Sequence, residues 1–298
     1  MTNFAYLNGV YNITPTPFHA DGSLDEASLA TLTHFNIDKG VDGMTILGVM
    51  GETSKVTDAE RDRIIAGVLA AADGKLPICV GTTHTSTWGC IEYSKRAQAL
   101  GAQAVMVAPP KLSRTNDEAL RRHYLAVAEA IDIPIVVQDH PTSSGVHMSV
   151  DVIVRIAEEA PLCRYLKLED VPSPPKAAKV RAAYPAMIIF GGLGGMMFLE
   201  ELKNGADGTM TGFGFPEILV KIHRQFTSGD LDGATDTFYR YCPLIRFEAQ
   251  EGISLTLRKQ LYYQRGAIAS PQARQPFMPL DAGTLRDLND LLTRLQLG

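Results

Sequence analysis

Residues 9–18 read GVYNITPTPF, a short apolar run followed by a loop that contains two prolines. An apolar run of this length beside turn residues predicts a buried β-strand. In an open, doubly wound sheet, the loop after the first strand carries G-x-G-x-x-G and cradles a pyrophosphate. The TPTPF loop cannot hold a pyrophosphate at the N-terminus of a helix, so this stretch argues against that fold.

Short apolar runs alternate with longer helical stretches along most of the chain. Capping-box sequences at residues 23–26 (SLDE) and 57–60 (TDAE) predict two helix starts, and apolar residues follow the second at helical spacing. Parallel strands need a crossover, usually a helix, so the alternation predicts parallel pairing. The strands are predicted at residues 9–14, 43–47, 77–81, 104–108, 134–138, 165–167, 187–190 and 208–211.

These strand–helix units predict an α/β fold, a (β/α)8 TIM barrel, which typically takes about 250 residues. The chain has 298 residues, and helical segments are predicted from Asp230 to its end. We therefore expect a barrel over residues 1–228 and a C-terminal helical extension over residues 229–298. No linker-like stretch separates the two, so the extension is expected to pack on the barrel within a single structural domain.

Composition and charge argue against two kinds of partner. The net charge of −5 and the isoelectric point near 5.8 do not fit a nucleic-acid-binding surface, which needs basic residues. No apolar stretch approaches the roughly 20 residues that span a bilayer, and the start of the chain does not resemble a secretory leader. The four cysteines lack metal-finger spacing. We expect a soluble, cytoplasmic protein without nucleic-acid or membrane partners.

The most informative residue for function is Lys167, in the apolar run YLKLED at residues 165–170. An ammonium group is costly to bury, and desolvation favours the neutral amine, which can attack a carbonyl carbon. The alternatives are an exposed edge strand or an ion pair with Glu169 or Asp170. In a TIM barrel the active site lies at the carboxyl ends of the strands. Lys167 ends the sixth strand, so we expect it to form a Schiff base.

Other chemically useful residues are predicted at the same end of the barrel. The loop GVMG at residues 48–51 could turn its backbone N–H groups towards a substrate carboxylate, and Glu52 could take part or tie the loop down. His84 is a candidate general acid or base, or an ordinary hydrogen-bonding residue. The glycine-rich residues 191–195 could bind phosphate, or make room for a ligand beside Lys167. No metal-ligand spacing is present.

Over essentially its whole length, the chain resembles the dihydrodipicolinate synthase and N-acetylneuraminate lyase family. The motifs that carry the resemblance are TPTPF at residues 14–18, GVMGE at residues 48–52, GT at residues 81–82 and Lys167 in the sixth strand. The resemblance implies a class I (Schiff-base) lyase with no metal or organic cofactor. It also implies a 2-oxo acid substrate such as pyruvate, and a homotetramer built of dimers.

Departures from the family pattern indicate a branch. The family's proton-relaying tyrosine at the end of strand five is Gln138 here, a hydroxyl residue of its strand-two loop is Val49, and a further tyrosine is replaced within Pro109–Lys111. These losses argue against dihydrodipicolinate synthase activity. The pair Gln138–Asp139 and the sequence TTH at residues 82–84 resemble the dehydratase branch, especially L-2-keto-3-deoxyarabonate dehydratase. The strand-two loop differs from that branch, so a paralogue with another substrate stays open.

We expect an enzyme that dehydrates a 2-keto-3-deoxy sugar acid, such as L-2-keto-3-deoxyarabonate. The expected catalytic residues are Lys167, Gln138, His84 and Glu169, and the expected substrate-binding residues are Gly48, Val49, Met50, Gly51, Thr16, Gly191 and Thr211. Glu169 shares a strand face with Lys167 by the period of two. The alternatives are a pyruvate-dependent aldolase or other carbon–carbon lyase, a phosphate-binding isomerase, and a catalytically silent ligand-binding barrel.

Overall fold

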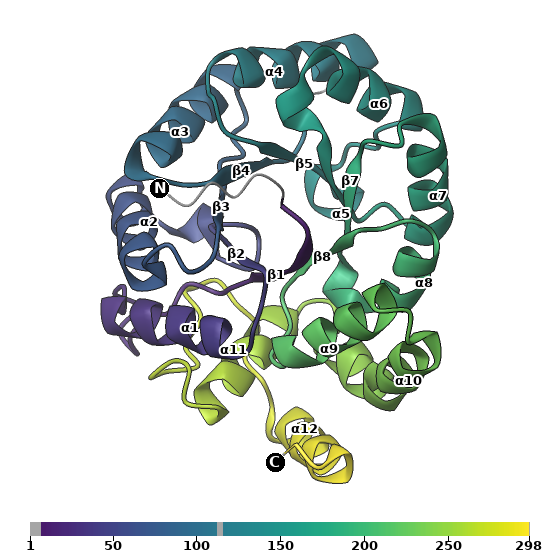
Figure 1. Cartoon of the computed structure of the whole chain (residues 1–298). Coiled ribbons are helices and arrows are strands. Elements are labelled where there is room, and N and C mark those ends of the chain that lie inside the picture. Colours follow the sequence, from purple (N-terminus) through teal and green to yellow (C-terminus); the bar gives the residue numbers. More distant parts are fainter. Residues whose placement is uncertain (1–6, 112–115, 298) are drawn as a thin grey trace.

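Eight parallel strands close into a barrel in the computed structural model, which describes residues 7–111 and 116–297 (Figure 1). Each strand pairs with the next along the chain, and β8 returns to β1, so the predicted TIM barrel is confirmed. The strands are β1 (Gly9–Ile13), β2 (Gly43–Ile46), β3 (Ile78–Gly81), β4 (Ala104–Val107), β5 (Ile135–Asp139), β6 (Tyr165–Leu168), β7 (Ile188–Gly191) and β8 (Gly208–Thr211).

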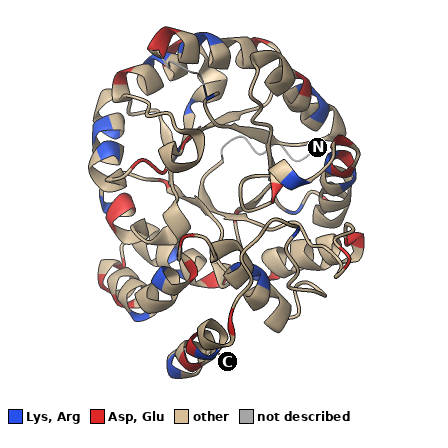
Figure 2. Ribbon diagram, turned by 180° about the vertical axis from the view of Figure 1, so that it is seen from behind, with Lys and Arg blue, Asp and Glu red and all other residues tan. Residues whose placement is uncertain are grey.

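Helices surround the strands, and most of the charged residues lie on this outer layer (Figure 2). The first nine helices are α1 (Glu26–Asp38), α2 (Asp58–Ala72), α3 (Thr87–Leu100), α4 (Asp117–Glu129), α5 (Pro141–Ser144), α6 (Val150–Glu159), α7 (Ser173–Ala183), α8 (Phe198–Lys203) and α9 (Pro216–Thr227). Three short 3-10 turns are η1 (Thr53–Lys55), η2 (Pro161–Cys163) and η3 (Leu193–Gly195). Among the described residues, no helix is long and apolar enough to cross a bilayer.

The two predicted capping boxes have different outcomes. Thr57 and Glu60 form the expected box at the start of α2. The box predicted from Ser23 is wrong, because α1 begins three residues later and Asp25 caps it by accepting the N–H of Ser28. Ser23 instead donates to Asp21 in the preceding turn. Both residues are good caps, so the position of the turn decides between them.

Alternation along the strands decides which side chains reach the barrel interior. Tyr165 belongs to an interior apolar cluster, whereas Leu166 and Leu168 pack in the cluster beneath the helices. Lys167 therefore shares the face of Tyr165 and points inward. Below it the interior is filled by Leu7, Tyr11, Ile13, Cys79, Ala104, Met106, Val136, Tyr165, Phe190 and Met210. The packed interior closes the barrel at the N-terminal ends of the strands, and the polar residues gather at the opposite end.

The last part of the chain forms α10 (Leu231–Glu248), α11 (Ser254–Gln264) and α12 (Ala282–Leu295), which confirms the predicted helices after Asp230. Helix α11 is tied to the ends of β1 and β8: the Tyr262 hydroxyl donates to the Phe213 carbonyl over 2.9 Å and accepts from the Asn12 amide over 2.7 Å. In Figure 1, α12 lies outside the ring of helices. The predicted boundary after residue 228 falls between α9 and α10, and the single-domain division stays a prediction.

Candidate active site

A cavity of about 300 Å³ opens at the carboxyl end of the barrel, around the side chain of Lys167. It is lined by strand ends and also by the segment that joins α10 to α11. The lining residues are Ile13, Val49, Met50, Gln138, His140, Thr142, Lys167, Glu169, Leu193, Gly194, Met196, Thr211, Gly212, Ala249, Glu251, Gly252, Ser254 and Arg258. This position is where TIM barrels place their active sites.

Lys167, Glu169 and Gln138 form a buried polar cluster at this cavity. The Lys167 ammonium lies 2.7 Å from Glu169 Oε2, and the Gln138 amide donates to the same oxygen over 2.9 Å. Gln138 is the register partner of Lys167 across the β5–β6 pair, which explains why the two side chains meet. Only 3% of the Lys167 side chain is exposed, so the alternative of an exposed edge strand is wrong and that of an ion pair is present.

The electrostatics of the cluster favour a charged carboxylate. Burial opposes ionisation of Glu169, but the charge of Lys167, that of His140 at pH values where it is protonated, and the hydrogen bonds from Lys167 and Gln138 hold the pKa of Glu169 below its ordinary value. Burial also lowers the pKa of His140, whose Nδ1 lies 3.8 Å from Glu169 Oε2. At neutral pH, Glu169 is therefore ionised and His140 is mostly neutral. A lysine beside an ionised carboxylate has a proton acceptor within hydrogen-bond reach.

Glycines after β7 make room for acidic side chains. A Cβ atom at Gly192 would lie 2.4 Å from Glu169 Cγ, and one at Gly191 would overlap the carboxylate of Glu201. Gly191 is part of β7 and faces Glu201 of α8, so the predicted substrate-binding residue does not line the cavity with Lys167. Burial raises the pKa of Glu201 to about 7.

The same glycine-rich segment does not offer a phosphate site. The N–H groups of Leu193, Gly194 and Gly195 are donated to Glu169, Thr211 Oγ1 and the Gly192 carbonyl, over 3.4, 2.9 and 2.9 Å. A phosphate-binding loop needs several N–H groups free for the anion. These contacts argue against a phosphate-binding isomerase, because the loop expected to bind phosphate has no N–H groups available for it among residues 193–195. Thr211 lines the cavity as predicted, with its hydroxyl oxygen accepting from Gly194.

The loop after β2 is held in place by its neighbours. Gly51 donates its N–H to the Gly48 carbonyl over 3.0 Å, and the Thr16 hydroxyl donates to the Gly51 carbonyl over 2.6 Å. Within the described residues, the N–H groups of Val49 and Met50 have no acceptor in the protein, and both residues line the cavity. Thr16 therefore holds the loop and does not line the cavity. The predicted carboxylate-binding role of this loop stays a prediction.

Glu52 ties this loop to the C-terminal helices. Its carboxylate lies 2.5 Å from the Lys259 ammonium of α11 and 3.1 Å from that of Lys55, and it accepts the Arg274 N–H over 2.9 Å. The side chain is buried and all of these partners lie within the protein. Of the two roles considered for Glu52, tying the loop down is the one that the contacts support.

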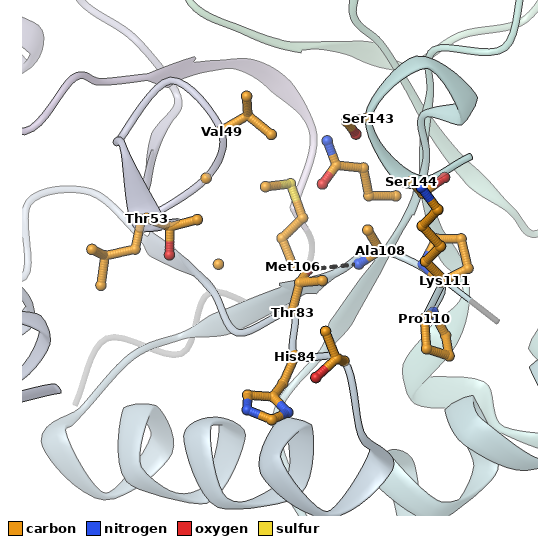
Figure 3. A pocket seen from close by; sticks show the side chains of 16 residues that line it. Val49, Thr53, Thr83, His84, Met106, Ala108, Pro110, Lys111, Ser143 and Ser144 are labelled. Atoms are coloured by element: carbon orange, nitrogen blue, oxygen red, sulfur yellow. Dashed lines mark hydrogen bonds between the residues drawn. The ribbon is translucent and has the colours of Figure 1, made fainter. Parts of the chain in front are cut away.

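His84 lines a different cavity, of about 240 Å³, which shares Val49 and Gln138 with the first. Figure 3 shows His84 at the edge of this cavity beside the start of α3, with Val49 at the opposite edge. Its Nδ1 accepts the Ser86 N–H over 3.0 Å and lies 3.1 Å from the Ser86 hydroxyl. These contacts match the structural alternative, and His140 is the histidine that lies beside the lysine cluster.

Asp139, the second residue of the pair that resembles the dehydratase branch, is the last residue of β5. Its carboxylate lies 2.6 Å from the Lys176 ammonium, which also lies 2.8 Å from Asp170. Asp139 is therefore paired beneath the loops, on the helix side of the sheet. Within the described residues, no group of three or more His, Cys, Asp or Glu side chains could hold a metal ion.

With this geometry established, comparison with known proteins is informative. The model of the dihydrodipicolinate synthetase family matches residues 6–295. The chain belongs to this family. The similarity to its members extends over nearly the full length of both chains, so it includes the barrel and the C-terminal helices.

Two curated family members illustrate the range of similarity. L-2-keto-3-deoxyarabonate dehydratase from Azospirillum brasilense is 35% identical, over 96% of this chain and 94% of its own. A 4-hydroxy-tetrahydrodipicolinate synthase from Methanothrix thermoacetophila is 28% identical, over 97% of each chain. The crystal structure of a dihydrodipicolinate synthase from Rhodopseudomonas palustris superposes with a TM-score of 0.92 at 33% identity, covering 97% of both chains. The resemblance predicted from the motifs is confirmed.

Arg258 of α11 lines the cavity but was not predicted from the sequence. Arg258 is 5% exposed, and its guanidinium lies beside Met50, with Nη1 3.1 Å from the methionine sulfur. One signal was present: Arg258 lies between Leu257 and Leu261, on a helix whose apolar residues are buried. A charged residue on an apolar helix face points to a buried cation, but not to the pocket that it reaches.

Proposed function

We propose that this protein is a Schiff-base lyase that removes water from a 2-keto-3-deoxy sugar acid. The observation that carries the proposal is the buried Lys167 at the barrel mouth, with Glu169 2.7 Å from its ammonium group. Membership of a family that contains L-2-keto-3-deoxyarabonate dehydratase supports the substrate class. Three further expectations stay predictions: that the enzyme needs no cofactor, that it forms a homotetramer, and that it is cytoplasmic.

In the first step, the free N–H groups of Val49 and Met50 hold the C1 carboxylate, and C2 lies against Lys167. Glu169 takes a proton from the ammonium, and the neutral amine attacks C2. Loss of the C2 oxygen as water leaves a protonated imine. The carboxylate of Glu169 lies close enough to the lysine nitrogen to carry these protons.

In the second step, the protonated imine acidifies the C3 hydrogens. Ionised Glu169 removes one of them, and the C3 electron pair forms an enamine. The enamine expels the C4 hydroxyl, and Glu169 returns the proton so that the group leaves as water. Proton transfer of this kind typically contributes about 10²- to 10⁴-fold in rate. Hydrolysis of the imine then releases the product and restores Lys167.

Carbon–carbon cleavage would need a base on the C4 hydroxyl. At the end of β5, where the family pattern has a tyrosine, this chain has Gln138, whose amide nitrogen donates to Glu169. An amide side chain does not take up a proton at neutral pH. The site therefore favours elimination of the C4 hydroxyl over cleavage of the C3–C4 bond.

Borohydride trapping tests the proposal. The protein is mixed with 2-keto-3-deoxy-L-arabonate and borohydride, its intact mass is measured, and the modified peptide is mapped. We expect an adduct on Lys167 that has lost water. A pyruvate-sized adduct would instead indicate an aldolase, and no adduct with either this compound or pyruvate would indicate a binding protein.

Two variants separate chemistry from folding. Lys167→Ala should abolish the adduct and turnover while the far-ultraviolet circular dichroism and the unfolding midpoint stay close to those of the wild type. Lys111→Ala, in the neighbouring cavity, is the matched control and should keep the adduct on Lys167. Turnover by Lys167→Ala would refute the covalent mechanism.

A further inference from the structure

Arg258 enters the cavity from α11, outside the barrel strands, with its hydrogen-bonding capacity incompletely used. Nη1 donates to the Met50 sulfur, a weak acceptor, over 3.1 Å. Within the described residues, Nε has no hydrogen-bond acceptor, and the nearest carboxylate oxygen paired with it, on Glu248, is 3.6 Å away. A buried guanidinium that lacks oxygen acceptors is costly unless a ligand supplies them.

Glu248 compensates this charge only in part. It is fully buried in α10 and accepts the Gly214 N–H over 2.9 Å. Burial raises the pKa of Glu248 to about 7, although Arg258 acts in the opposite direction. Near neutral pH a fraction of the Glu248 side chains is protonated, and in that fraction the remaining carboxylate that acts on Arg258 is Glu169, which lies beyond ion-pair distance.

The guanidinium lies over the loops that follow β7 and β8. A Cβ atom at Gly194 would lie 3.0 Å from Arg258 Nη2, and one at Gly212 would lie 3.4 Å from Arg258 Cδ. The β7 loop has a leucine and two glycines at residues 193–195, whose N–H groups already have acceptors within the protein. On this side of the cavity, Arg258 therefore supplies the donors that the loop does not.

We propose that Arg258 binds the oxygen atoms at the end of the substrate furthest from its C1 carboxylate, and so selects hydroxylated 2-oxo acids. The proposal rests on the proposed function, which places C1 at the β2 loop and C2 at Lys167. The remaining carbons then extend past the Met50 side chain towards the β7 and β8 loops, where the guanidinium lies between the Met50 sulfur and Gly194. The fork of N–H donors on an arginine can contact two neighbouring oxygen atoms at once. The C4 and C5 hydroxyls of a 2-keto-3-deoxypentonate provide such a pair.

The test compares two substrates that differ only at the distal end. 2-Keto-3-deoxy-L-arabonate has a C5 hydroxyl, and 4-hydroxy-2-oxopentanoate of the same C4 configuration has a methyl group there. Arg258→Met should lower kcat/KM by roughly 10- to 100-fold for the first, the range for a lost charged hydrogen bond, and by much less for the second. Arg258→Lys should recover part of the discrimination. Trapping of pyruvate, which has no distal oxygen, should proceed at the wild-type rate.

Further variants keep the test decisive. Arg258→Met combined with Glu248→Gln removes both charges, so a loss of discrimination in the double variant does not come from a stranded carboxylate. Arg246→Met, an exposed arginine of α10, is the matched control and should change neither substrate's kcat/KM. Equal losses for both substrates, or slower pyruvate trapping in Arg258→Met, would overturn the distal assignment. Failure of the wild type to trap either 2-keto-3-deoxy-L-arabonate or pyruvate would overturn the proposed function and this inference with it.

Discussion

Replacing Gly192 by alanine would place a methyl group where the Glu169 side chain now lies. The new Cβ would be 2.4 Å from Cγ and 2.8 Å from Cδ of Glu169, whereas ordinary contact begins near 3.4 Å. Glu169 must therefore move by about 1 Å, since residue 192 directly follows β7 and its carbonyl is held by the Gly195 N–H. A movement of this size lengthens the 2.7 Å and 2.9 Å contacts from Lys167 and Gln138 beyond hydrogen-bonding range.

A misplacement of about 1 Å in a proton-transferring group typically costs about 100-fold in rate. We therefore expect Gly192→Ala to lower kcat/KM for dehydration by about 100-fold, equivalent to about 2.7 kcal/mol of transition-state stabilisation. Gly67→Ala in α2 is the matched control, because its Cβ would meet Leu29 at an ordinary 3.6 Å. The control should keep wild-type kinetics.

A double-variant cycle shows whether the effect passes through Glu169. Kinetics are measured for Gly192→Ala, Glu169→Gln and the pair together, with pyruvate trapping as a second measurement. If the methyl group acts by displacing the carboxylate, the pair should be no slower than Glu169→Gln alone. Wild-type activity in Gly192→Ala, or a further 100-fold loss in the Glu169→Gln background, would refute the steric argument.

Three further predictions concern buried polar residues. The pKa of Glu201 is raised to about 7, so the folded state keeps this proton to higher pH than the unfolded state does. The free energy of unfolding should therefore fall as the pH rises from about 4.5 to 7. Glu201→Gln should reduce this pH dependence, measured by denaturant titrations at several pH values. Lys259→Met leaves the buried Glu52 without its closest cation and should lower the free energy of unfolding by about 3 to 5 kcal/mol; an unchanged midpoint would contradict this. Gln138→Leu removes the amide contact to Glu169 and should raise the apparent pKa of the kcat/KM profile that reports this carboxylate; an unmoved profile would exclude the contact as a determinant.

Much of the fold follows from patterns visible in the sequence, because apolar alternation and crossover geometry leave few arrangements for eight short strands. The strand ends differ by at most one residue from the prediction, since pairing partners set them. Strand β5 continues through Asp139, which pairs with Leu168 of β6, a contact that composition does not reveal. The start of the first helix could not be predicted for a similar reason, because Ser23 and Asp25 are equally favourable N-cap residues.

The lysine cluster was predictable because it depends on short-range rules. The period of two puts Lys167 inside the barrel, and neighbouring strands bring Gln138 beside it. Residues whose role depends on contacts between distant loops were not predictable. Thr16 was expected to bind substrate, but its hydroxyl reaches the carbonyl of Gly51 in another loop. Arg258 escaped notice because nothing in its own helix indicates that α11 covers the barrel mouth.

The pairing of Lys259 with Glu52 limits how freely this scaffold can be recombined. Adjacent residues of α11 have different contacts: Arg258 enters the cavity, and Lys259 holds the β2 loop through its ion pair with Glu52. A β2 loop transplanted alone from a relative would be separated from the α11 side chain that pairs with it. An α11 transplanted alone would bring a buried cation without its carboxylate partner. Chimaeras of this barrel should therefore exchange the β2 loop and α11 together, even though about two hundred residues separate them in the chain.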